Sequence, residues 1–313
     1  MQSVYIQNLN FDVFKGFSEV TYLSLNDLEI ESLPPKCFSH MKSLFNLEIR
    51  NTSLKNLTKD AFVGLDNLQQ LYLSDNQIEH IEIGVFKNIP ALNLIFLQQN
   101  NIMEINENMF KNAPKLITLD LSNNKISSLN PNSFELLPSL QFLSLRGNKL
   151  SKLPTDVFFK LPQLSNLDLS DNGINSLPPG IFKPLENLDS LNLGKNKFDV
   201  ITKTTIPVVS SLKYLYLNDN QIKTIKAGAF QDFKSLSELD LSGNALKYIN
   251  SDTFKGLTEI HHLNLMNNQI SDLNPDIFKN FLSLQRLSLD GNALSSEVLN
   301  TLASKFLGSM NYF

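Results

Sequence analysis

The sequence predicts an α/β repeat fold, a curved solenoid with a parallel sheet on its concave face and irregular, short helical or extended segments on its convex face. Three observations predict it. The pattern LxxLxLxxN recurs every 24 residues through most of the 313-residue chain. Asparagine fills one position in ten of these units, and phenylalanine fills another position in eleven. A fixed period of this length is typical of stacked repeats, in which each unit packs against its neighbours.

The leucine positions define the expected strands. Within each unit, leucines at every second position would point inward and the residues between them outward, which is the alternation of a short strand. Strands of successive units would stack as a parallel sheet about 4.8 Å apart. The units begin, without an insertion, at Val20, Leu44, Leu68, Leu92, Leu116, Leu140, Leu164, Leu188, Leu212, Leu236 and Ile260, and a last, degenerating unit begins at Leu284.

The repeat also divides the chain. We expect a partial first repeat over residues 1–19, about twelve units over 20–294, and a C-terminal helical cap or the start of a truncated region over 295–313. In the first segment, the apolar positions of a repeat whose first part is missing are kept, which indicates a fragment or an incomplete gene. These positions are Val4, Ile6, Leu9, Phe14 and Phe17.

Residues 295–308 have the pattern of a helix. Leu294, Val298, Leu302 and Phe306 are spaced by four, and Gly308 is a plausible stop. A helix here is expected to cover the open core of the last repeat, and the alternative is a helix that binds a partner.

The repeated asparagine is expected to turn the chain off each strand, because its side chain both donates and accepts hydrogen bonds and satisfies backbone groups of the bend. Leu28 and Thr52 replace it in the first two complete units, where we expect a weaker ladder. The asparagines are Asn76, Asn100, Asn124, Asn148, Asn172, Asn196, Asn220, Asn244, Asn268 and Asn292.

The repeated phenylalanine predicts a second, buried spine. Half of the 22 phenylalanines fall on this one position, and only Ile206 interrupts them. Ring contacts along such a stack would add to the free energy of burial. The spine comprises Phe14, Phe38, Phe62, Phe86, Phe110, Phe134, Phe158, Phe182, Phe230, Phe254 and Phe278.

Composition bounds the environment and the partners. A net charge of −4 argues against a nucleic-acid partner. No run of 18 apolar residues predicts a membrane span, and the first twenty residues do not have the pattern of a signal peptide. Cys37 is the single cysteine and is expected to be a half-buried free thiol. That fits a reducing compartment, or an extracellular fragment whose disulfides lie elsewhere.

The pattern LxxLxLxxNxLxxLxxxxFxxLxx resembles the 24-residue, typical-class leucine-rich repeat over essentially the whole chain. Units such as residues 164–188 look like those of animal extracellular proteins, among them Toll-like receptor ectodomains, the acid-labile subunit of the growth-factor-binding complex, chaoptin-like adhesion proteins and secreted insect immune proteins. The resemblance implies recognition of proteins or microbial molecules outside the cell by a receptor, adhesion or innate-immune protein. The cysteine-rich caps of those families do not appear in this sequence. Two alternatives remain: an intracellular scaffold or regulatory protein, and a structural array without a tight ligand.

A partner is expected on the concave face, where apolar residues at outward strand positions stand out. Tyr72 neighbours Leu94 and Phe96 on the next unit. Exposed, clustered aromatic residues mark interaction surfaces. The candidate partner-binding residues are Tyr72, Leu94, Phe96, Phe142, Tyr214 and Tyr216.

Charge on the same face is predominantly acidic, ten carboxylates against four cations, which would steer a basic partner toward it. The acids are Asp27, Glu48, Asp75, Asp120, Asp168, Asp171, Asp219, Glu238, Asp240 and Asp290, and the cations are Arg50, Arg146, Lys195 and Arg286.

Two N-glycosylation motifs occur, at Asn51 and Asn56, although asparagine is so common here that chance explains them. Glycosylation of Asn51 would shift a binding site toward later units.

Nothing in the sequence predicts an enzyme, a metal site or a cofactor. No HExxH, GxSxG, CxxC or phosphate-loop motif occurs. His261 and His262 are adjacent on an expected strand, so they should point to opposite faces rather than share a metal ion. Uncapped ends of the stack would make self-association possible.

Overall fold

The computed structural model describes residues 9–10, 12–278 and 281–306. The expectations for Val4, Ile6 and Gly308 lie outside these residues. The chain divides into two compact units, residues 1–149 with 156–164 (unit 1) and residues 150–155 with 165–313 (unit 2). Each unit is described by itself.

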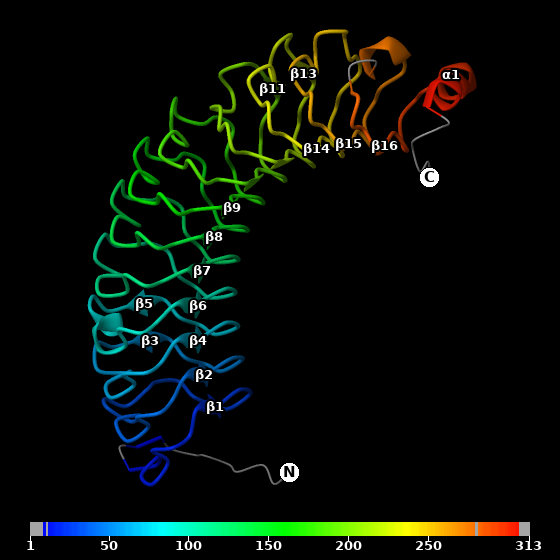
Figure 1. The fold of residues 1–313 in the computed structure, drawn as a ribbon. Helices are drawn as coiled ribbons and strands as arrows, with labels where there is room; N and C mark the ends of the chain where they lie inside the picture. Colours follow the sequence, from blue (N-terminus) through cyan, green and yellow to red (C-terminus); the bar gives the residue numbers. More distant parts are fainter. Residues whose placement is uncertain (1–8, 11, 279–280, 307–313) are drawn as a thin grey trace. The chain divides into compact units, whose positions relative to one another are not determined.

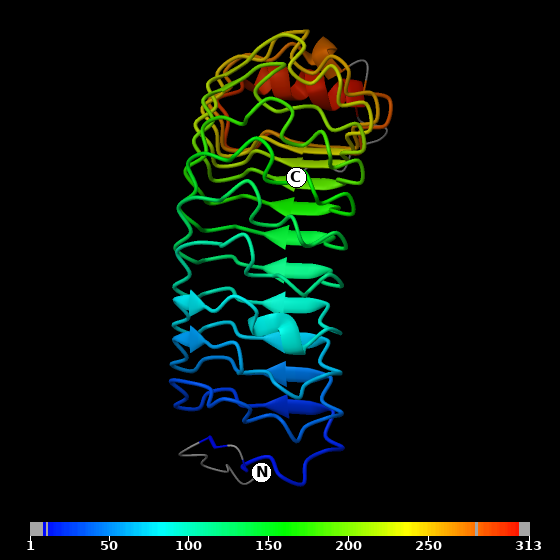
Figure 2. The same cartoon turned by 90° about the vertical axis from the view of Figure 1, so that its left-hand side faces the viewer.

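Unit 1 is a stack of parallel three-residue strands (Figure 1), as the leucine spacing predicts. Each strand pairs with the next at an offset of 24 residues, so Leu47 lies beside Leu71 and Leu71 beside Ile95. Figure 2 shows these strands as a column of arrows that point the same way. The strands are β1 (Tyr22–Ser24), β2 (Asn46–Glu48), β4 (Gln70–Tyr72), β6 (Leu94–Phe96), β7 (Thr118–Asp120) and β8 (Phe142–Ser144).

Unit 2 repeats the arrangement, with the same offset between neighbouring strands. Its strands are β9 (Asn166–Asp168), β10 (Ser190–Asn192), β12 (Tyr214–Tyr216), β14 (Glu238–Asp240), β15 (His262–Asn264) and β16 (Arg286–Ser288).

The segments away from the main strands are short, as expected for the outer half of each repeat. Two-residue strands pair as β3 (Asn56–Leu57) with β5 (His80–Ile81) in unit 1 and as β11 (Val200–Ile201) with β13 (Thr224–Ile225) in unit 2. Short 3₁₀ helices form at η1 (Val85–Asn88) and η2 (Pro275–Phe278).

The core lies between the strands and these outer segments. Inward leucines such as Leu119 and Leu121 are 0% exposed, and so are Phe38 and Phe158 of the phenylalanine spine. Phe110 and Phe134 are 2% and 1% exposed. Stacked neighbours within the spine lie 5.8 Å apart at Phe86 and Phe110 and 6.4 Å apart at Phe230 and Phe254.

The start of the described chain differs from expectation at one apolar position. Phe14 is buried and stacks on Phe38 with 5.4 Å between ring centroids. Phe17 is instead 49% exposed and touches the edge of the Phe14 ring, so it is not a core residue.

The buried asparagines join three stretches of backbone. The Asn124 side-chain nitrogen donates to the carbonyl oxygens of Leu97 and Leu121, each at 3.0 Å, while its oxygen accepts from the Ile102 nitrogen. Asn148 repeats the arrangement 24 residues later. The oxygen of Asn172 likewise accepts from the Leu150 nitrogen at 3.0 Å. Each asparagine therefore satisfies backbone groups that would otherwise be buried without partners.

The ladder changes at the two exceptions. The Thr52 hydroxyl and backbone nitrogen both donate to the side-chain oxygen of Asn76, and the Leu54 nitrogen donates to the Thr52 hydroxyl at 3.4 Å. Thr52 has no second donor for the preceding turn, and Leu28 has no polar side-chain group at all. The ladder therefore has fewer hydrogen bonds here than in the later repeats, as expected.

The C-terminal helix α1 runs from Ser296 to Phe306 and contacts η2. Leu302 is 2% exposed, while Leu299 remains 45% exposed. That α1 serves as a cap for the array stays a prediction. Among the described residues, no helix has the length and apolar content needed to cross a membrane.

Candidate functional site: the outer surface of the strands

The strands of each unit present two side chains outward, because the middle residue of every strand points into the core. The middle residues Leu47, Leu71 and Ile95 are fully buried. The first and third residues of the same strands are half-buried. We call this outer surface, together with the turn that follows each strand, the sheet face.

Tyr72 and Phe96 form a parallel stack on the sheet face of unit 1. They are the third residues of β4 and β6 and are register partners. Their ring centroids lie 4.9 Å apart and their planes differ by 2°. This separation matches the spacing of neighbouring strands, about 4.8 Å, so the sheet itself holds the two rings against each other.

Arg50 extends this stack. Its guanidinium carbon lies 4.3 Å from the centroid of the Tyr72 ring. Because Arg50 follows β2, on the side of β4 opposite to β6, it covers the ring face that Phe96 leaves open. Its Nη2 also lies 3.5 Å from Glu48 Oε1. We call Arg50, Tyr72 and Phe96 the aromatic column. The sequence places Arg50 on this face as a cation but does not predict its contact with the Tyr72 ring.

Leu94 and Phe142 flank the column differently. Leu94 is half-buried on the same strand as Phe96, two residues earlier. Phe142 is the first residue of β8 and is 36% exposed. Thr118 lies between them in the register row, which places Phe142 about 10 Å from Leu94. The structure therefore brings Tyr72, Leu94 and Phe96 together and leaves Phe142 apart.

One further aromatic residue lies on the sheet face of unit 1. Tyr22, the first residue of β1, is 54% exposed. It was not among the candidates from the sequence, although it occupies an outward strand position of its repeat. Phe45, which precedes β2, is 39% exposed.

The sheet face of unit 2 is polar around its two tyrosines. Tyr214 and Tyr216 are half-buried on β12, but no described aromatic ring stacks on either. Burial raises the pKa of Tyr216 to about 12, and the carboxylate of Glu238 adds to the rise. The register partners of the two tyrosines are Ser190, Asn192, Glu238 and Asp240.

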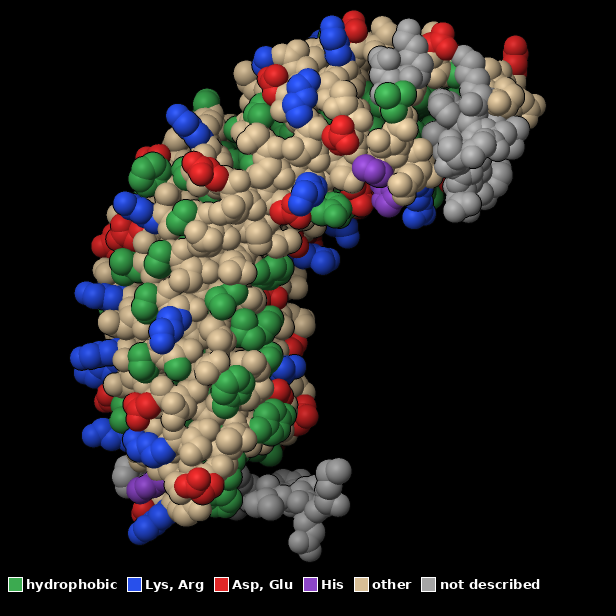
Figure 3. Space-filling view, in the orientation of Figure 1, with side chains coloured by type: hydrophobic (Ala, Val, Ile, Leu, Met, Phe, Trp, Pro, Cys, Tyr) green, Lys and Arg blue, Asp and Glu red, His purple; other side chains and the backbone are tan. Residues whose placement is uncertain are grey.

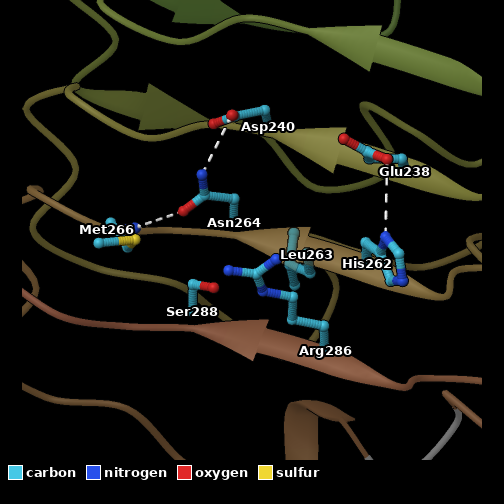
Figure 4. Close-up of a pocket in the computed structure, with 8 residues that line it drawn as sticks. All are labelled: Glu238, Asp240, His262, Leu263, Asn264, Met266, Arg286 and Ser288. Atoms are coloured by element: carbon cyan, nitrogen blue, oxygen red, sulfur yellow. Dashed lines mark hydrogen bonds and ion pairs between the residues drawn. The ribbon is translucent and has the colours of Figure 1, made fainter. Parts of the chain in front are cut away.

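A shallow hollow lies beyond these tyrosines (Figure 4), lined by β14, β15 and β16. His262 Nδ1 lies 3.6 Å from Glu238 Oε2. The Asn264 side-chain nitrogen donates to Asp240 Oδ2 at 3.1 Å, and its oxygen accepts from the Met266 nitrogen at 3.1 Å. These polar groups satisfy one another, and the hollow is open to solvent.

The sequence predicts both histidines on one strand, but only His262 lies on it. The strand begins at His262, so its alternation does not extend back to His261. His261 Nδ1 lies 2.8 Å from the carbonyl oxygen of Glu259 and 3.2 Å from the hydroxyl of Ser237. Neither imidazole enters the core. No group of three acidic, histidine or cysteine side chains in the described chain is arranged to hold a metal ion.

Several acidic residues on the sheet face stabilise the turns of the backbone that follow the strands. Oδ1 of Asp120 accepts a hydrogen bond from the Ser122 nitrogen at 2.9 Å, two residues later. Asp168 and Asp240 do the same in unit 2. An aspartate that bonds backbone two residues ahead stabilises a turn.

Backbone conformation explains another group of acids. The residue before each ladder asparagine adopts a positive φ, a region that aspartate, asparagine and glycine tolerate best. Asp75, Asp171 and Asp219 have φ of 59°, 55° and 54° at this position, and Asp27 has a φ of 61° before Leu28, which replaces the asparagine. Immediately before β10 and β12, Asp189 and Lys213 form an ion pair at 2.8 Å.

The remaining sequence candidates lie at the surface or deep in the core. Asn51 and Asn56 are both exposed, and the Asn51 side-chain nitrogen donates to Asp27 Oδ1 at 2.7 Å. Cys37 is 0% exposed, so the expected half-buried thiol is in fact fully buried. Burial raises the pKa of this thiol to about 12.

Comparison with known proteins identifies the class. The sequence pattern of the family described as "Leucine rich repeat" matches residues 2–54, 46–102, 94–150, 143–198, 186–246 and 244–294. The chain therefore belongs to the leucine-rich repeat family. A comparison with curated proteins finds no match.

Solved structures of two receptor complexes resemble the chain. One is from the Toll–Spatzle complex, a molecular hub in Drosophila development and innate immunity, with 26% identity and a TM-score of 0.83 over 93% of this chain. The other is from a TLR13–ssRNA13 complex, with 28% identity and a TM-score of 0.84 over 95% of this chain. The chain spans 40% and 47% of the lengths of those two chains. The family and these neighbours support a recognition module.

Proposed function

We propose that this chain is the ligand-recognition part of an extracellular leucine-rich repeat protein, a receptor, adhesion or innate-immune protein that binds a protein ligand on the sheet face of unit 1. The parallel stack of Tyr72 and Phe96, 4.9 Å apart on the outer surface of two neighbouring strands, carries this proposal. Its rings have no packing role in the core, because the middle residue of each strand already fills that space.

The column has the physical properties of a binding hot spot. Tyrosine and arginine are enriched at such positions. The strand register and the Arg50 guanidinium fix the Tyr72 ring before a ligand arrives, so little side-chain entropy is lost on binding. Leu94 supplies apolar surface beside the rings. A few ordered, amphipathic side chains of this kind provide most of the affinity in known protein interfaces.

A protein ligand fits the charge of this face better than a nucleic acid. Spatzle is bound by Toll and single-stranded RNA by TLR13 in the two similar structures. On the sheet face of unit 1, Arg50 and Arg146 are the cations among the described residues, and Arg50 is paired with Glu48. Figure 3 shows Lys and Arg side chains projecting mainly from the side of unit 1 away from the strands. Phosphate binding needs clustered cations at the contact surface.

An extracellular setting is supported by the two receptor neighbours and by the exposure of Asn51 and Asn56. Asn51 directly follows Arg50, so a glycan there would border the column. The alternative is an intracellular scaffold, favoured by the single free cysteine. Expression of the chain behind a secretion signal in animal cells, followed by glycosidase treatment, separates the two. A mass decrease supports the extracellular setting, and an unchanged mass favours the scaffold.

The binding proposal is tested with a ligand selected from a displayed library of secreted proteins. Tyr72→Ala combined with Phe96→Ala should weaken its binding while leaving the melting temperature nearly unchanged. Phe159→Ala is the matched control, because Phe159 is 58% exposed and lies off the strands. The proposal fails if selected ligands bind the double variant as tightly as they bind the Phe159→Ala variant.

A further inference from the structure

We propose that the sheet face over β7 is a binding slot for an arginine side chain of the protein ligand, stacked on Phe96 and ion-paired with Asp120. The inference rests on the proposed function and specifies the chemistry of the ligand at that site. It follows from four features of the column and its surroundings.

The first feature is the open ring face of Phe96. Tyr72 covers the face toward β4, and no described ring or cation covers the face toward β7. The column therefore runs from cation to ring to ring at strand spacing, and the next position along it, over β7, holds neither a ring nor a cation. A planar cation placed over β7 would be its next member. Cations positioned over an aromatic face are attracted by the quadrupole of the ring.

The second feature is the carboxylate at this position. Asp120 is the register partner of Phe96 on β7. Its Oδ1 accepts from the Ser122 nitrogen, which fixes the carboxylate, and its Oδ2 has no hydrogen-bond partner among the described residues. Asp240 of unit 2 differs, because the Asn264 side chain already donates to its Oδ2. Asp120 is thus oriented and still has an oxygen available for a donor.

The third feature is the size of the side chains beside the carboxylate. Ser144, the register partner of Asp120 on β8, has a short side chain. No long side chain therefore stands at the third strand position of β7 or β8. Phe96 lies on one side of Asp120, and Phe142 lies at the first strand position of β8.

The fourth feature is the local balance of charge. Glu48 neutralises Arg50 at the far end of the column, so the column itself does not repel a second cation strongly. Arg146 is exposed two residues after β8 and has no carboxylate within ion-pair distance in the described chain. Among the described cations on the sheet face of unit 1, Arg146 is the one without an ion pair, and this makes it a useful test position.

These features favour arginine over lysine. A guanidinium is planar, so it stacks on a ring while its edge donates to a carboxylate. A lysine ammonium is a hydrated point charge that makes one of these contacts less well. The ligand that fits the face therefore presents an arginine beside apolar residues that cover Leu94 and Tyr72.

The test uses a probe of defined chemistry, N-acetyl-arginine N-methylamide, titrated into the intact chain and followed by NMR. Saturable binding with a dissociation constant on the order of millimolar is expected for one such side chain. The side-chain protons next to the guanidinium should shift upfield because they lie over the Phe96 ring. The neutral isostere N-acetyl-citrulline N-methylamide should bind more weakly, by about threefold to tenfold.

Variants assign the site. Asp120→Asn keeps the oxygen that accepts from the Ser122 nitrogen but loses the charge, and should remove most of the preference for arginine over citrulline. Phe96→Leu should remove the upfield shift. Asp168→Asn is the matched control, because Asp168 makes the same turn hydrogen bond but has Asn192 as its register partner on β10. Arg146→Gln should strengthen binding of the arginine probe.

The outcomes separate this inference from the proposed function. Equal binding of the two probes, or an unchanged preference in Asp120→Asn, overturns the slot even if Tyr72→Ala with Phe96→Ala abolishes ligand binding. Conversely, an Asp120-dependent preference for arginine supports the slot even if that double variant binds selected ligands normally, in which case the proposed function fails alone.

Discussion

Units 1 and 2 share one scaffold and differ on the surface that the scaffold presents. Both contain the leucine core, the buried asparagines and the phenylalanine spine. The third strand positions of unit 1 hold Tyr72 and Phe96 as stacked rings. The corresponding region of unit 2 holds Asp240 and Asn264, joined by a hydrogen bond. The repeated core positions therefore determine the fold. The outward strand positions, which differ between the two units, carry the information about a ligand.

The physical reason is that the two kinds of position obey different constraints. An inward leucine or a ladder asparagine is determined by packing and by backbone hydrogen bonds, which are the same in every repeat. An outward strand position contacts solvent, so many residue types fit it equally well. Two adjacent aromatic residues there are not required by the fold, which is why they carry information about a ligand.

The largest expected effect tests whether the scaffold is equivalent in the two units. Phe134→Ala in unit 1 and Phe230→Ala in unit 2 should each lower the free energy of unfolding by about 3–5 kcal/mol, because each leaves a cavity in a closely packed core. Both rings are at most 1% exposed. Chemical denaturation measures the loss. A large cost at one position and a negligible cost at the other would show that the two spines are not equivalent.

The next effect concerns the hydrogen-bond ladder. Asn124→Ala should cost about 1–3 kcal/mol, because it leaves the Ile102 nitrogen without its buried partner and removes one of the two side-chain donors to the Leu97 carbonyl. Thr52→Ala should cost less, since Thr52 has no amide to donate to a preceding turn. Denaturation of both variants tests the order, and a greater loss for Thr52→Ala would contradict the assigned role of the ladder.

A smaller effect on stability, which depends on pH, is expected from Cys37 in unit 1. Its pKa is raised from 9.0 to about 12 in the folded chain. Below pH 9 the thiol is protonated in both states and has no effect on the pH dependence. Above pH 9 the unfolded chain releases this proton while the folded chain retains it, so stability falls as pH rises from 9 toward 12. The loss at pH 10 should be about 1.4 kcal/mol.

The control for this pH effect is Cys37→Ala, in which other groups titrate but the thiol is absent. The difference in unfolding free energy between the two proteins should therefore shrink as pH rises from 8 to 10. A thiol-reactive dye should label the native protein slowly and the denatured protein quickly. Rapid labelling of the native state at pH 8 is inconsistent with a buried Cys37.

The smallest effect is expected in the hollow of unit 2. Glu238→Gln removes the contact with His262. The side chains of Glu238 and His262 are 30% and 47% exposed. Solvent screens such a pair, so stability should change by less than about 1 kcal/mol. Denaturation at low and high salt measures it. A larger loss that persists at high salt would mean that the hollow is a structural centre of unit 2.

Much of the fold was predictable because the same pattern of buried residues recurs in every repeat. Residues that recur at a fixed slot, such as Asn124 and Phe134, are buried where the pattern indicates. The burial of an individual residue was harder to predict. Phe17 fits the apolar frame, yet it is exposed. Its repeat position alone does not say whether a neighbouring side chain covers it.

The candidate site was predictable only in part. Tyr72, Leu94 and Phe96 are adjacent, because strand register follows from the repeat length. The position of Arg50 over the Tyr72 ring depends on side-chain conformation, which no pattern encodes. The turn hydrogen bond of Asp120 and the positive φ of Asp75 were likewise hidden, since an acidic residue is equally compatible with recognition and with a turn.

The most direct test of the central claim compares the sheet faces of the two units in one binding experiment. Dissociation constants for a selected protein ligand are measured with Tyr72→Ala plus Phe96→Ala and with Tyr214→Ala plus Tyr216→Ala. Recognition through the aromatic column predicts at least about thirtyfold weaker binding for the first pair and less than about threefold for the second. Equal losses for the two pairs, or a loss confined to the second, would contradict the claim that unit 1 presents the binding surface.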